Sequence, residues 1–518
     1  MTSITVYDGS NTIGGNKIYV ESKGRGVFLD FGANFTKYNV FFQDFLVERS
    51  SRGIHDLLQL KLIPKLNIYR EDLVPSDLNV TLYPSLDVEA VLLSHAHLDH
   101  CGNIALLRKD IPIVATKTSI AILKALRDTE TSPKIGSEIF YMSTRVKAEG
   151  TDGMVLESPS KGIYETRLFQ CTSKPPKELR EFCSYRPGQE SRSAKKVVPN
   201  ELHSLDKLKA GFKVEAYDVD HSIYGASAYI LKGEIDIAYT GDFRLHGKYA
   251  FKTDHFVKAA REASVLITEG TRVGRKEESN VTEEEVFNYC LLAVSESDKL
   301  IVADFSSKNF ERLEMFLKIA KKLGKNLVIS PKDAYLLYAI GCAEGKCLMD
   351  NKEIRIYEEL RKKSRHKWET NIIKNSWSDR YVTSTEIRND LGRYILCFSF
   401  YDLKHLLDIK PEKGSYIYSS SEAFSEEQTF DFIRLSHWLN FFGLKTYGFS
   451  LTGKGEGFIP EFEKGFHASG HVSKDELLKV INEIDPDLII PVHTENPQWF
   501  RQHFDNVKIP KEGESIVL

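Results

Sequence analysis

The chain has 518 residues, of which 42% are hydrophobic and 28% are charged, and its formal net charge is -3 at pH 7. This length favours two domains, and the composition is that of an ordinary globular protein rather than a disordered or membrane-embedded chain. The charge excludes a strongly basic protein that binds nucleic acid without specificity, so any contact with nucleic acid must come from local patches.

Residues 1–20 predict polar turns around short strands and lack the basic start and apolar core of a secretory signal. No run of about 18 uncharged apolar residues occurs, which argues against a membrane span. The seven cysteines are scattered and form no C-x-x-C pair, so reduced thiols are favoured over disulfides or a structural zinc site. We therefore expect a cytoplasmic protein with no membrane partner.

The first 115 residues predict an α/β arrangement. Alternating apolar residues at 4–7, 17–20 and 26–31 indicate antiparallel strands. The apolar segment 88–93 leads directly into the run Ser94-His95-Ala96-His97-Leu98-Asp99-His100, and a helical pattern with a further strand at 111–115 follows. Strand, polar loop and helix in this order are typical of an α/β fold. Cys101, beside the run, is interpreted as a small buried residue rather than a ligand.

The middle of the chain has a different pattern. Between residues 172 and 197 the composition shifts to Ser, Pro, Lys, Arg and Gly, which predicts an exposed loop; a solvated insertion is favoured there over a basic arm that binds phosphates. From about residue 280, helices alternate with short apolar strands, as in a parallel doubly wound sheet. The strand pattern of the first part returns at 488–493. We therefore divide the chain into a first domain at 1–275, an inserted domain at 276–449 and a return to the first domain at 450–518.

Three imidazoles and a carboxylate within six residues predict a metal site, because divalent ions such as zinc prefer imidazole nitrogen and carboxylate oxygen. Further candidate ligands lie at the ends of strands that come later in the chain. We expect one ion to be held by His95, His97 and His221. We expect a second ion to be held by Asp99, His100 and His493, with Asp242 as the bridge. Two adjacent ions can activate water and neutralise charge on a phosphoryl or acyl centre, so Asp99 and Asp242 also count as catalytic residues. The expected cofactors are two Zn²⁺, with Mn²⁺ as the alternative ion.

This pattern resembles the metallo-β-lactamase superfamily, whose signature is H-x-H-x-D-H followed by a later His, an Asp and a last His. Three further positions resemble motifs A, B and C of the β-CASP nucleases: Glu269 in Leu266-Ile267-Thr268-Glu269, His471 in Ser469-Gly470-His471 and His493 in Pro491-Val492-His493. Within that branch, residues 466–471 and 491–495 are most similar to ribonuclease J, especially its compact archaeal type. The resemblance spans nearly the whole chain and implies a metallo-β-lactamase αββα sandwich with an inserted β-CASP domain.

The resemblance also implies an activity. It predicts a two-zinc ribonuclease acting on single-stranded RNA, as a 5′-to-3′ exonuclease first and an endonuclease second, with assembly as a homodimer left open. His471 would protonate the leaving oxygen, and Glu269 would orient His471 and raise its pKa. Five residues are candidates for contact with substrate phosphates: His467, Ser469, Ser419, Ser420 and Ser421. The three serines resemble the family's phosphate-binding loop, but its Pro-Ile-Pro-Gly-Asn-Glu continuation is replaced by residues 422–427 of a different sequence.

Three other functions are weighed against this one. A β-CASP DNA nuclease shares the same motifs, but its motif C position is typically Val, so His493 favours RNA. A hydrolase of a small ester, lactone or thioester shares the metal ligands, although the inserted domain and Ser469-Gly470-His471 count against it. A non-catalytic scaffold would have lost ligands, and every ligand position is filled here.

Overall fold

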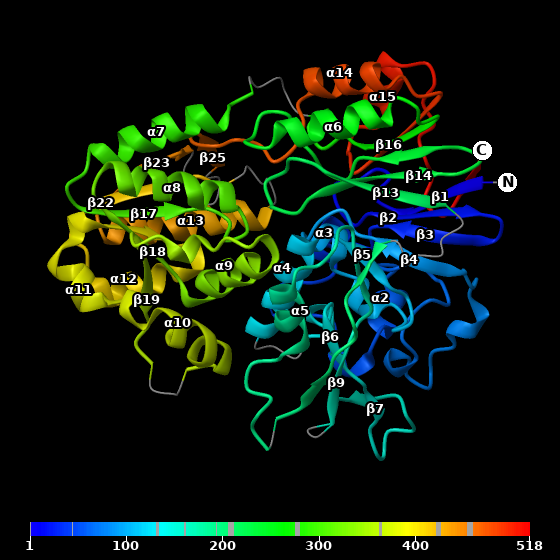
Figure 1. The fold of residues 1–518 in the computed structure, drawn as a ribbon, viewed down its shortest axis with the longest axis horizontal. Coiled ribbons are helices and arrows are strands. Elements are labelled where there is room, and N and C mark those ends of the chain that lie inside the picture. Colours follow the sequence, from blue (N-terminus) through cyan, green and yellow to red (C-terminus); the bar gives the residue numbers. More distant parts are fainter. Residues whose placement is uncertain are drawn as a thin grey trace.

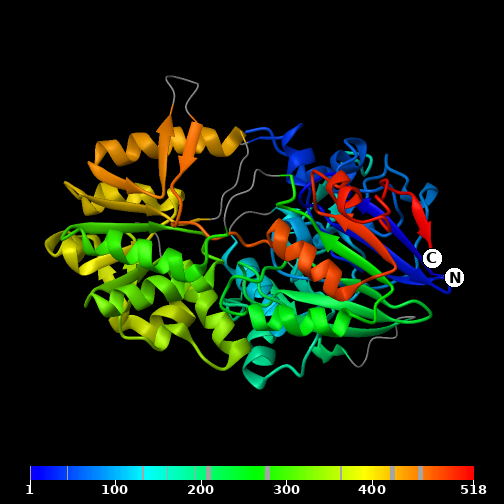
Figure 2. The same ribbon diagram turned by 90° about the horizontal axis from the view of Figure 1, so that it is seen from above.

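A computed structural model describes residues 2–43, 45–130, 134–159, 162–192, 194–205, 212–274, 280–361, 365–420, 426–452 and 459–518. The elements form two lobes that lie side by side (Figure 1). Strands from both ends of the chain build one lobe, and the middle of the chain builds the other. Figure 2 shows the late helix α14 (Lys474–Ile484) on the lobe that holds the N-terminal strands, so the chain returns to the lobe in which it starts.

The first lobe is a sandwich of two sheets, with strand orders β12-β10-β5-β4-β3-β2-β1-β27 and β13-β14-β15-β16-β26. Their facing side chains, such as Val20, Leu92 and Ile267, are fully buried in one core cluster, because alternate residues of a strand point to the same face. The first sheet contains β1 (Thr2–Asp8), β2 (Lys17–Ser22), β3 (Arg25–Leu29), β4 (Val88–Leu92), β5 (Ile113–Ala115), β10 (Phe169–Cys171), β12 (His203–Ser204) and β27 (Ser515–Val517). The second contains β13 (Lys213–Asp218), β14 (Ser227–Lys232), β15 (Ile237–Tyr239), β16 (Val265–Glu269) and β26 (Leu488–Val492).

Helices cover the outer faces of both sheets. Helix α4 (Lys117–Thr129) packs Ile120 into the core cluster that also contains Val91 of β4. On the other side, α6 (Ala250–Ala260) and α14 pack against the second sheet in a separate cluster. The layers therefore run helix, sheet, sheet, helix, which confirms the predicted αββα sandwich.

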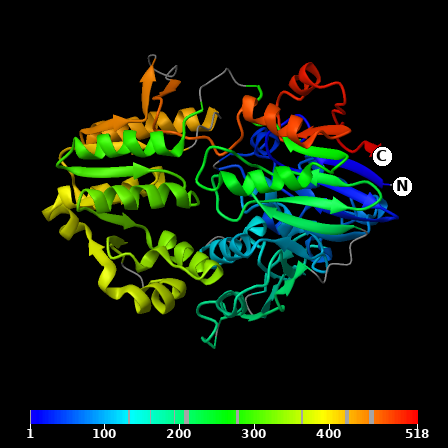
Figure 3. The same cartoon turned by 45° about the horizontal axis from the view of Figure 1, so that its top comes forward.

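The second lobe is built on a seven-stranded, all-parallel sheet with the order β20-β19-β18-β21-β17-β22-β23. Its strands are β17 (Leu300–Asp304), β18 (Asn326–Ile329), β19 (Ile354–Glu358), β20 (Tyr381–Thr383), β21 (Tyr394–Cys397), β22 (Gly414–Tyr418) and β23 (Leu444–Tyr447). One face is covered by α7 (Glu283–Ser295), α8 (Phe310–Lys322) and α9 (Pro331–Glu344), and the other by α11 (Ser384–Asn389), α12 (Leu406–Ile409) and α13 (Glu426–Phe441). This is the predicted doubly wound sheet, and Figure 3 shows it beside the sandwich.

Capping residues fix where key helices begin. At α14 the Ser473 hydroxyl accepts from the backbone N–H of Glu476, whose carboxylate accepts from the Ser473 backbone N–H. The same reciprocal pair opens α7, with Thr282 and Glu285. Such a capping box satisfies backbone donors that a helix start leaves free. Because Ser473 follows His471 by two residues, the cap at α14 also fixes the chain next to a predicted site residue.

The two predicted domain boundaries lie between residues 275 and 276 and between residues 449 and 450. The boundary between residues 275 and 276 lies outside the described residues. The boundary between 449 and 450 falls within β24 (Phe449–Thr452), which pairs with β25 (Ile459–Phe462). Phe449 packs on Phe432 of α13 with ring centroids 4.9 Å apart. We therefore propose that the inserted domain continues through the hairpin β24–β25.

One sequence-based expectation is corrected by the structure. Residues 172–197 are not simply an exposed loop, because they contain the helix α5 (Lys177–Ser184). Leu179, Phe182 and Cys183 recur at helical spacing and are buried, so this segment packs although polar residues dominate its composition. The remaining short elements are α1 (Phe35–Asn39), α2 (His55–Gln59), α3 (Leu98–Cys101), β6 (Tyr141–Ser143), β7 (Val146–Lys147), β8 (Leu156–Glu157), β9 (Ile163–Thr166), β11 (Lys196–Val198), α10 (Asn375–Trp377) and α15 (Gln498–His503).

Two further expectations can be compared with the structure. All seven cysteines are free, and Cys101 is fully buried, in agreement with its interpretation as a core residue. Among the described helices, none combines the length and apolar character that a bilayer crossing needs.

Candidate metal centre

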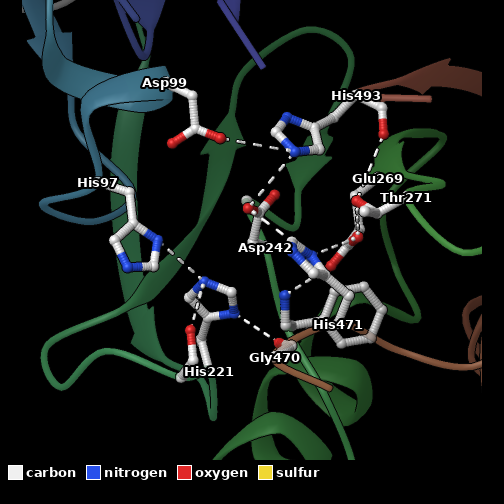
Figure 4. Close-up of polar contacts among 12 residues, drawn as sticks. His97, Asp99, His221, Asp242, Glu269, Thr271, Gly470, His471 and His493 are labelled. Carbon is white, nitrogen blue, oxygen red and sulfur yellow. Dashed lines mark hydrogen bonds and ion pairs between the residues drawn. The ribbon is translucent and has the colours of Figure 1, made fainter. Parts of the chain in front are cut away.

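The predicted metal ligands converge from loops that follow four different strands. The run from His95 to His100 follows β4 and ends in α3, His221 follows β13, Asp242 follows β15, and His493 follows β26. Figure 4 shows Asp242 between Asp99, His97, His221 and His493. The structure thus brings all seven predicted ligands together.

The first group consists of His95, His97 and His221. The Nε2 of His95 lies 3.0 Å from the Nδ1 of His97, which lies 3.3 Å from the Nε2 of His221. Ligand atoms of all three lie within 4.8 Å of one another. Burial and the neighbouring imidazoles lower the pKa of His95 and His97 well below the usual value. Neutral imidazoles whose nitrogens face one another fit a cation held between them, because their lone pairs would otherwise repel.

The second group consists of Asp99, His100, Asp242 and His493, whose ligand atoms also lie within 4.8 Å of one another. Three buried polar atoms of this group have no hydrogen-bond partner among the described residues: the Nε2 of His100, the Nε2 of His493 and the Oδ1 of Asp242. Buried polar atoms are normally paired, so three unpaired ones at one point fit a bound ion.

Asp242 lies closest to the centre of the two groups. Its Oδ2 is 3.0 Å from the Nε2 of His100 and 3.7 Å from that of His493. The same oxygen is 3.8 Å from the Nε2 of His95 in the first group. A carboxylate in this position can contact ions in both groups, as predicted for a bridging ligand.

The ionisation of the second group follows from its mixed charges. Burial alone would lower the pKa of His100, but the carboxylates of Asp242 and Asp99 raise it well above the usual value. Burial would raise the pKa of Asp242, but His100 and His493 lower it well below the usual value. Burial lowers the pKa of His221 in the first group to about 3. The imidazoles of the first group are therefore neutral at pH 7, whereas the second group pairs the ionised Asp242 with His100.

Residues behind the ligands hold them in place. The Nδ1 of His100 lies 2.7 Å from the Oδ2 of Asp30, which also accepts hydrogen bonds from the hydroxyls of Ser94 and Tyr239, both at 2.7 Å. The Nδ1 of His221 lies 2.5 Å from the carbonyl oxygen of Gly470. Such partners fix the ring so that the other nitrogen faces the metal. Asp30 is not among the predicted site residues, although its place directly after the apolar strand β3, close to the expected position of the histidine run, was the available signal.

The backbone is strained at two of these residues. Asp30 has a φ of 59° and His493 has a φ of 51°. Both values lie in the left-handed region, which residues other than glycine rarely adopt. Such strain costs about 1–3 kcal/mol at each residue and persists only where surrounding contacts enforce it. Both residues point side chains at the second group, so their backbone geometry serves the ligand arrangement.

The segment after Asp30 runs against the backbone of α3. The N–H of Phe31 donates to the carbonyl of His100 at 2.9 Å, and the N–H of Ala33 donates to that of Leu98 at 2.9 Å. Gly32 lies between them, and a Cβ there would be 1.7 Å from the carbonyl oxygen of Asp99. Only glycine permits this approach, so Gly32 sets the position of the helix turn that carries Asp99 and His100.

Glu269 and His471 form a pair beside the predicted metal ligands. The Nδ1 of His471 lies 3.0 Å from the Oε2 of Glu269, which also accepts from the Thr271 hydroxyl at 2.6 Å (Figure 4). The other carboxylate oxygen accepts from the backbone N–H of Phe243 at 2.9 Å. Burial would lower the pKa of His471, but Glu269 and Asp242 raise it above the usual value. His471 is therefore a partly exposed imidazole that readily carries a proton.

The residues predicted to contact phosphates are arranged differently. Both ring nitrogens of His467 face backbone carbonyls, those of Ser420 at 2.7 Å and Gly448 at 2.6 Å. The Ser419 hydroxyl is buried between Arg312 and the carbonyl of Phe466. The side chains of His467 and Ser419 are thus already engaged by other groups of the protein, which argues against the predicted contacts with phosphate.

The other members of that set have mixed positions. The Ser469 hydroxyl accepts from the backbone N–H of His471 at 3.1 Å, so it positions the chain at His471. Ser420 lines a cavity of about 930 Å³ between the lobes. Ser421 lies outside the described residues. The cavity is also lined by Leu98 and Gly102, which flank the predicted metal ligands Asp99 and His100, so it opens beside the predicted metal centre.

Comparisons with known proteins agree with this geometry. Residues 68–168 match the model of the Metallo-beta-lactamase superfamily, and residues 461–511 match that of the Zn-dependent metallo-hydrolase RNA specificity domain. The chain is 21% identical over 509 residues to Ribonuclease J of Pyrococcus abyssi (strain GE5 / Orsay), covering 96% of this chain and 90% of that protein. A crystal structure of a protein of unknown function from Enterococcus faecalis V583 is similar over 100% of both chains, with a TM-score of 0.65 and 22% identity. The resemblance to β-CASP proteins of the ribonuclease J type is thereby confirmed.

Proposed function

Because the chain is a metal-dependent hydrolase that carries a metallo-beta-lactamase superfamily domain, we propose that it is a two-zinc ribonuclease that hydrolyses RNA phosphodiester bonds. The match to an RNA specificity domain and the similarity to a ribonuclease J support RNA as the substrate. Release of nucleotides from the 5′ end is our first choice for its action, and internal cleavage is the second. Zn²⁺ is the proposed ion in both groups, with Mn²⁺ as the alternative.

The residues present fit two divalent ions. We propose that His95, His97 and His221 hold one ion and that Asp99, His100 and His493 hold the other, with Asp242 shared. Ions of this kind polarise a phosphoryl group and lower the pKa of nearby water. The chain itself keeps the ligands deprotonated or paired and fixes their direction through Asp30 and the carbonyl of Gly470.

The proposed proton donor is His471. Its Nδ1 is held by Glu269, which leaves Nε2 as the atom that can give a proton to the leaving oxygen of the RNA. Glu269 also stabilises the protonated ring, because the carboxylate is buried and hydrogen-bonded to Thr271 and Phe243 in one orientation. A positioned acid of this type contributes about 10²–10⁴-fold to a rate.

One observation carries the proposal. The Oδ2 of Asp242 lies within 4 Å of ligands from both groups and 3.8 Å from the Nδ1 of His471. A single point in the molecule therefore lies next to the two proposed ligand groups and the proposed proton donor. Such a combination would stabilise charge on a phosphoryl centre and assist the departing oxygen in the same step.

The test uses the purified chain with Zn²⁺ or Mn²⁺ and one RNA labelled at either end. The RNA carries a 5′-hydroxyl, a 5′-monophosphate or a 5′-triphosphate, and single-stranded DNA of the same sequence and a lactone or thioester serve as comparison substrates. Labelled mononucleotide released from the 5′ end supports the exonuclease, and internal fragments support the endonuclease. Cleavage of DNA alone, or of the small esters alone, would contradict the proposal. Sedimentation of the same sample tests whether two copies pair.

A further inference from the structure

The cavity between the lobes lies where the doubly wound sheet changes direction. Strands β17 and β21 are neighbours in the sheet, but the chain leaves them in opposite directions. From β17 it crosses past β21 to β18, and from β21 it crosses past β17 to β22. Open α/β sheets bind ligands outside the carboxyl ends of strands at such a point. The cavity is lined by the loops that leave these two strands, including Ser306, Ser307 and Lys308 after β17 and Ser399 after β21. The fold therefore predicts a ligand at this edge of the inserted domain.

Lys308 lines the cavity together with Leu98 and Gly102, which flank the predicted ligands Asp99 and His100. Its positive charge is also one of the causes that lower the pKa of His97. Asp99 and His97 lie on one side of Asp242, and His471 lies on the other (Figure 4). The cavity that Lys308 lines therefore adjoins the Asp99 side of the predicted metal centre.

The ammonium of Lys308 has no partner within the described part of the chain. No hydrogen bond or ion pair of its Nζ is formed there, and the side chain is only partly exposed. Desolvating an unpaired charge costs free energy, and burial accordingly lowers the pKa of Lys308. An anion in the cavity would remove this cost.

Other cations at the cavity differ in this respect. Arg127 is used within the protein, since its Nε donates to the carbonyl of Tyr141 at 3.0 Å and its guanidinium lies 4.6 Å from the Tyr141 ring centroid. Lys332 at the start of α9 is exposed, so water already solvates its charge. Beside Lys308, the exposed Ser306 and Ser307 supply hydroxyls in the loop that leads into α8, whose N-terminus favours negative charge.

We propose that Lys308, with Ser306 and Ser307, binds an RNA backbone phosphate next to the bond that is cleaved, on the side away from His471. This inference rests on the proposed function and assigns to the inserted domain a direct contact with the substrate backbone. Lys308 is then a positioning residue, since it holds the strand across the metal centre without taking part in proton transfer.

The test measures binding of an uncleavable phosphorothioate RNA to the Zn²⁺-loaded protein by fluorescence anisotropy at several salt concentrations. Lys308→Met should weaken binding on the order of tenfold at low salt, because one charged hydrogen-bonded contact is lost. It should also make the slope of log affinity against log salt concentration less negative by about 0.7, which is the value for one phosphate contact on a single strand. From 50 to 200 mM salt, the advantage of the unmodified protein should then shrink roughly 2.6-fold.

Two further variants separate contact from packing. Lys308→Arg keeps the charge and should restore most of the binding and the salt dependence. Lys332→Met removes an exposed charge at the rim of the same cavity and should leave both within about twofold. Unchanged binding in Lys308→Met, or an equal loss in Lys308→Arg, would overturn the inference while leaving the ribonuclease intact. If the unmodified protein neither binds nor cleaves RNA, the proposed function fails and the inference fails with it.

Discussion

Gly32→Ala should disable the metal centre without removing any ligand. The added Cβ would lie 1.7 Å from the carbonyl oxygen of Asp99 and 2.8 Å from the backbone nitrogen of His100. Real Cβ contacts are not shorter than 3.0 Å. The helix turn that carries both ligands must therefore move by at least 1.3 Å, the difference between 3.0 and 1.7 Å. Functional metal sites tolerate only about ±0.2 Å in ligand distance, so the second group would be disrupted.

The expected loss can be scaled from this displacement. A shift of about 1 Å at a catalytic group costs on the order of 10² in rate, and a disturbed support of a ligand costs about 10–100-fold in metal affinity. The assay is RNA cleavage together with Zn²⁺ content after dialysis, with thermal unfolding as a check that the variant folds. Gly136→Ala is the matched control, because a Cβ there would meet its nearest atom at 3.8 Å. A Gly32→Ala protein with normal zinc content and normal cleavage would refute the reasoning.

Three other predictions concern the same site. Glu269→Gln should lower the cleavage rate by about 10²-fold and shift the alkaline limb of the pH–rate profile to lower pH. The reason is that His471 must be protonated to act and loses the carboxylate that raises its pKa. An unshifted limb would argue against this pair. Asp99→Ala and His100→Ala should each abolish cleavage while circular dichroism stays unchanged, and a variant as active as the original chain would contradict the metal assignment. Removal of metal by a chelator should lower the melting temperature and added Zn²⁺ should restore it, since a ligand that binds only the folded state stabilises it; calorimetry that detects no change would count against bound metal.

Local sequence patterns predicted much of this site. The run from His95 to His100 comes directly after the apolar segment that forms β4, and loops at strand ends often carry functional residues. The strand-end positions of Asp242 and His493 gave the same signal. Resemblance to a known family supplied the pairing of Glu269 with His471, which no spacing along the chain could have shown.

Contacts between distant segments could not be predicted. Asp30 supports His100 across the neighbouring strands β3 and β4, and only the register of the sheet brings the two side chains together. The serine pattern predicted a phosphate contact for Ser419, yet Arg312 from another element occupies its hydroxyl. In α5, helical spacing of three apolar residues was present but was outweighed by the polar composition around it.

The last metal ligand has a consequence for the timing of activity. His493 is placed by β26, which enters the second sheet beside β16 after the whole inserted domain has been made. A growing chain on the ribosome therefore has an incomplete set of predicted ligands until β26 emerges and pairs with β16, which was made much earlier. An enzyme that hydrolyses RNA, as proposed, would in this way stay inactive while the inserted domain is still being made.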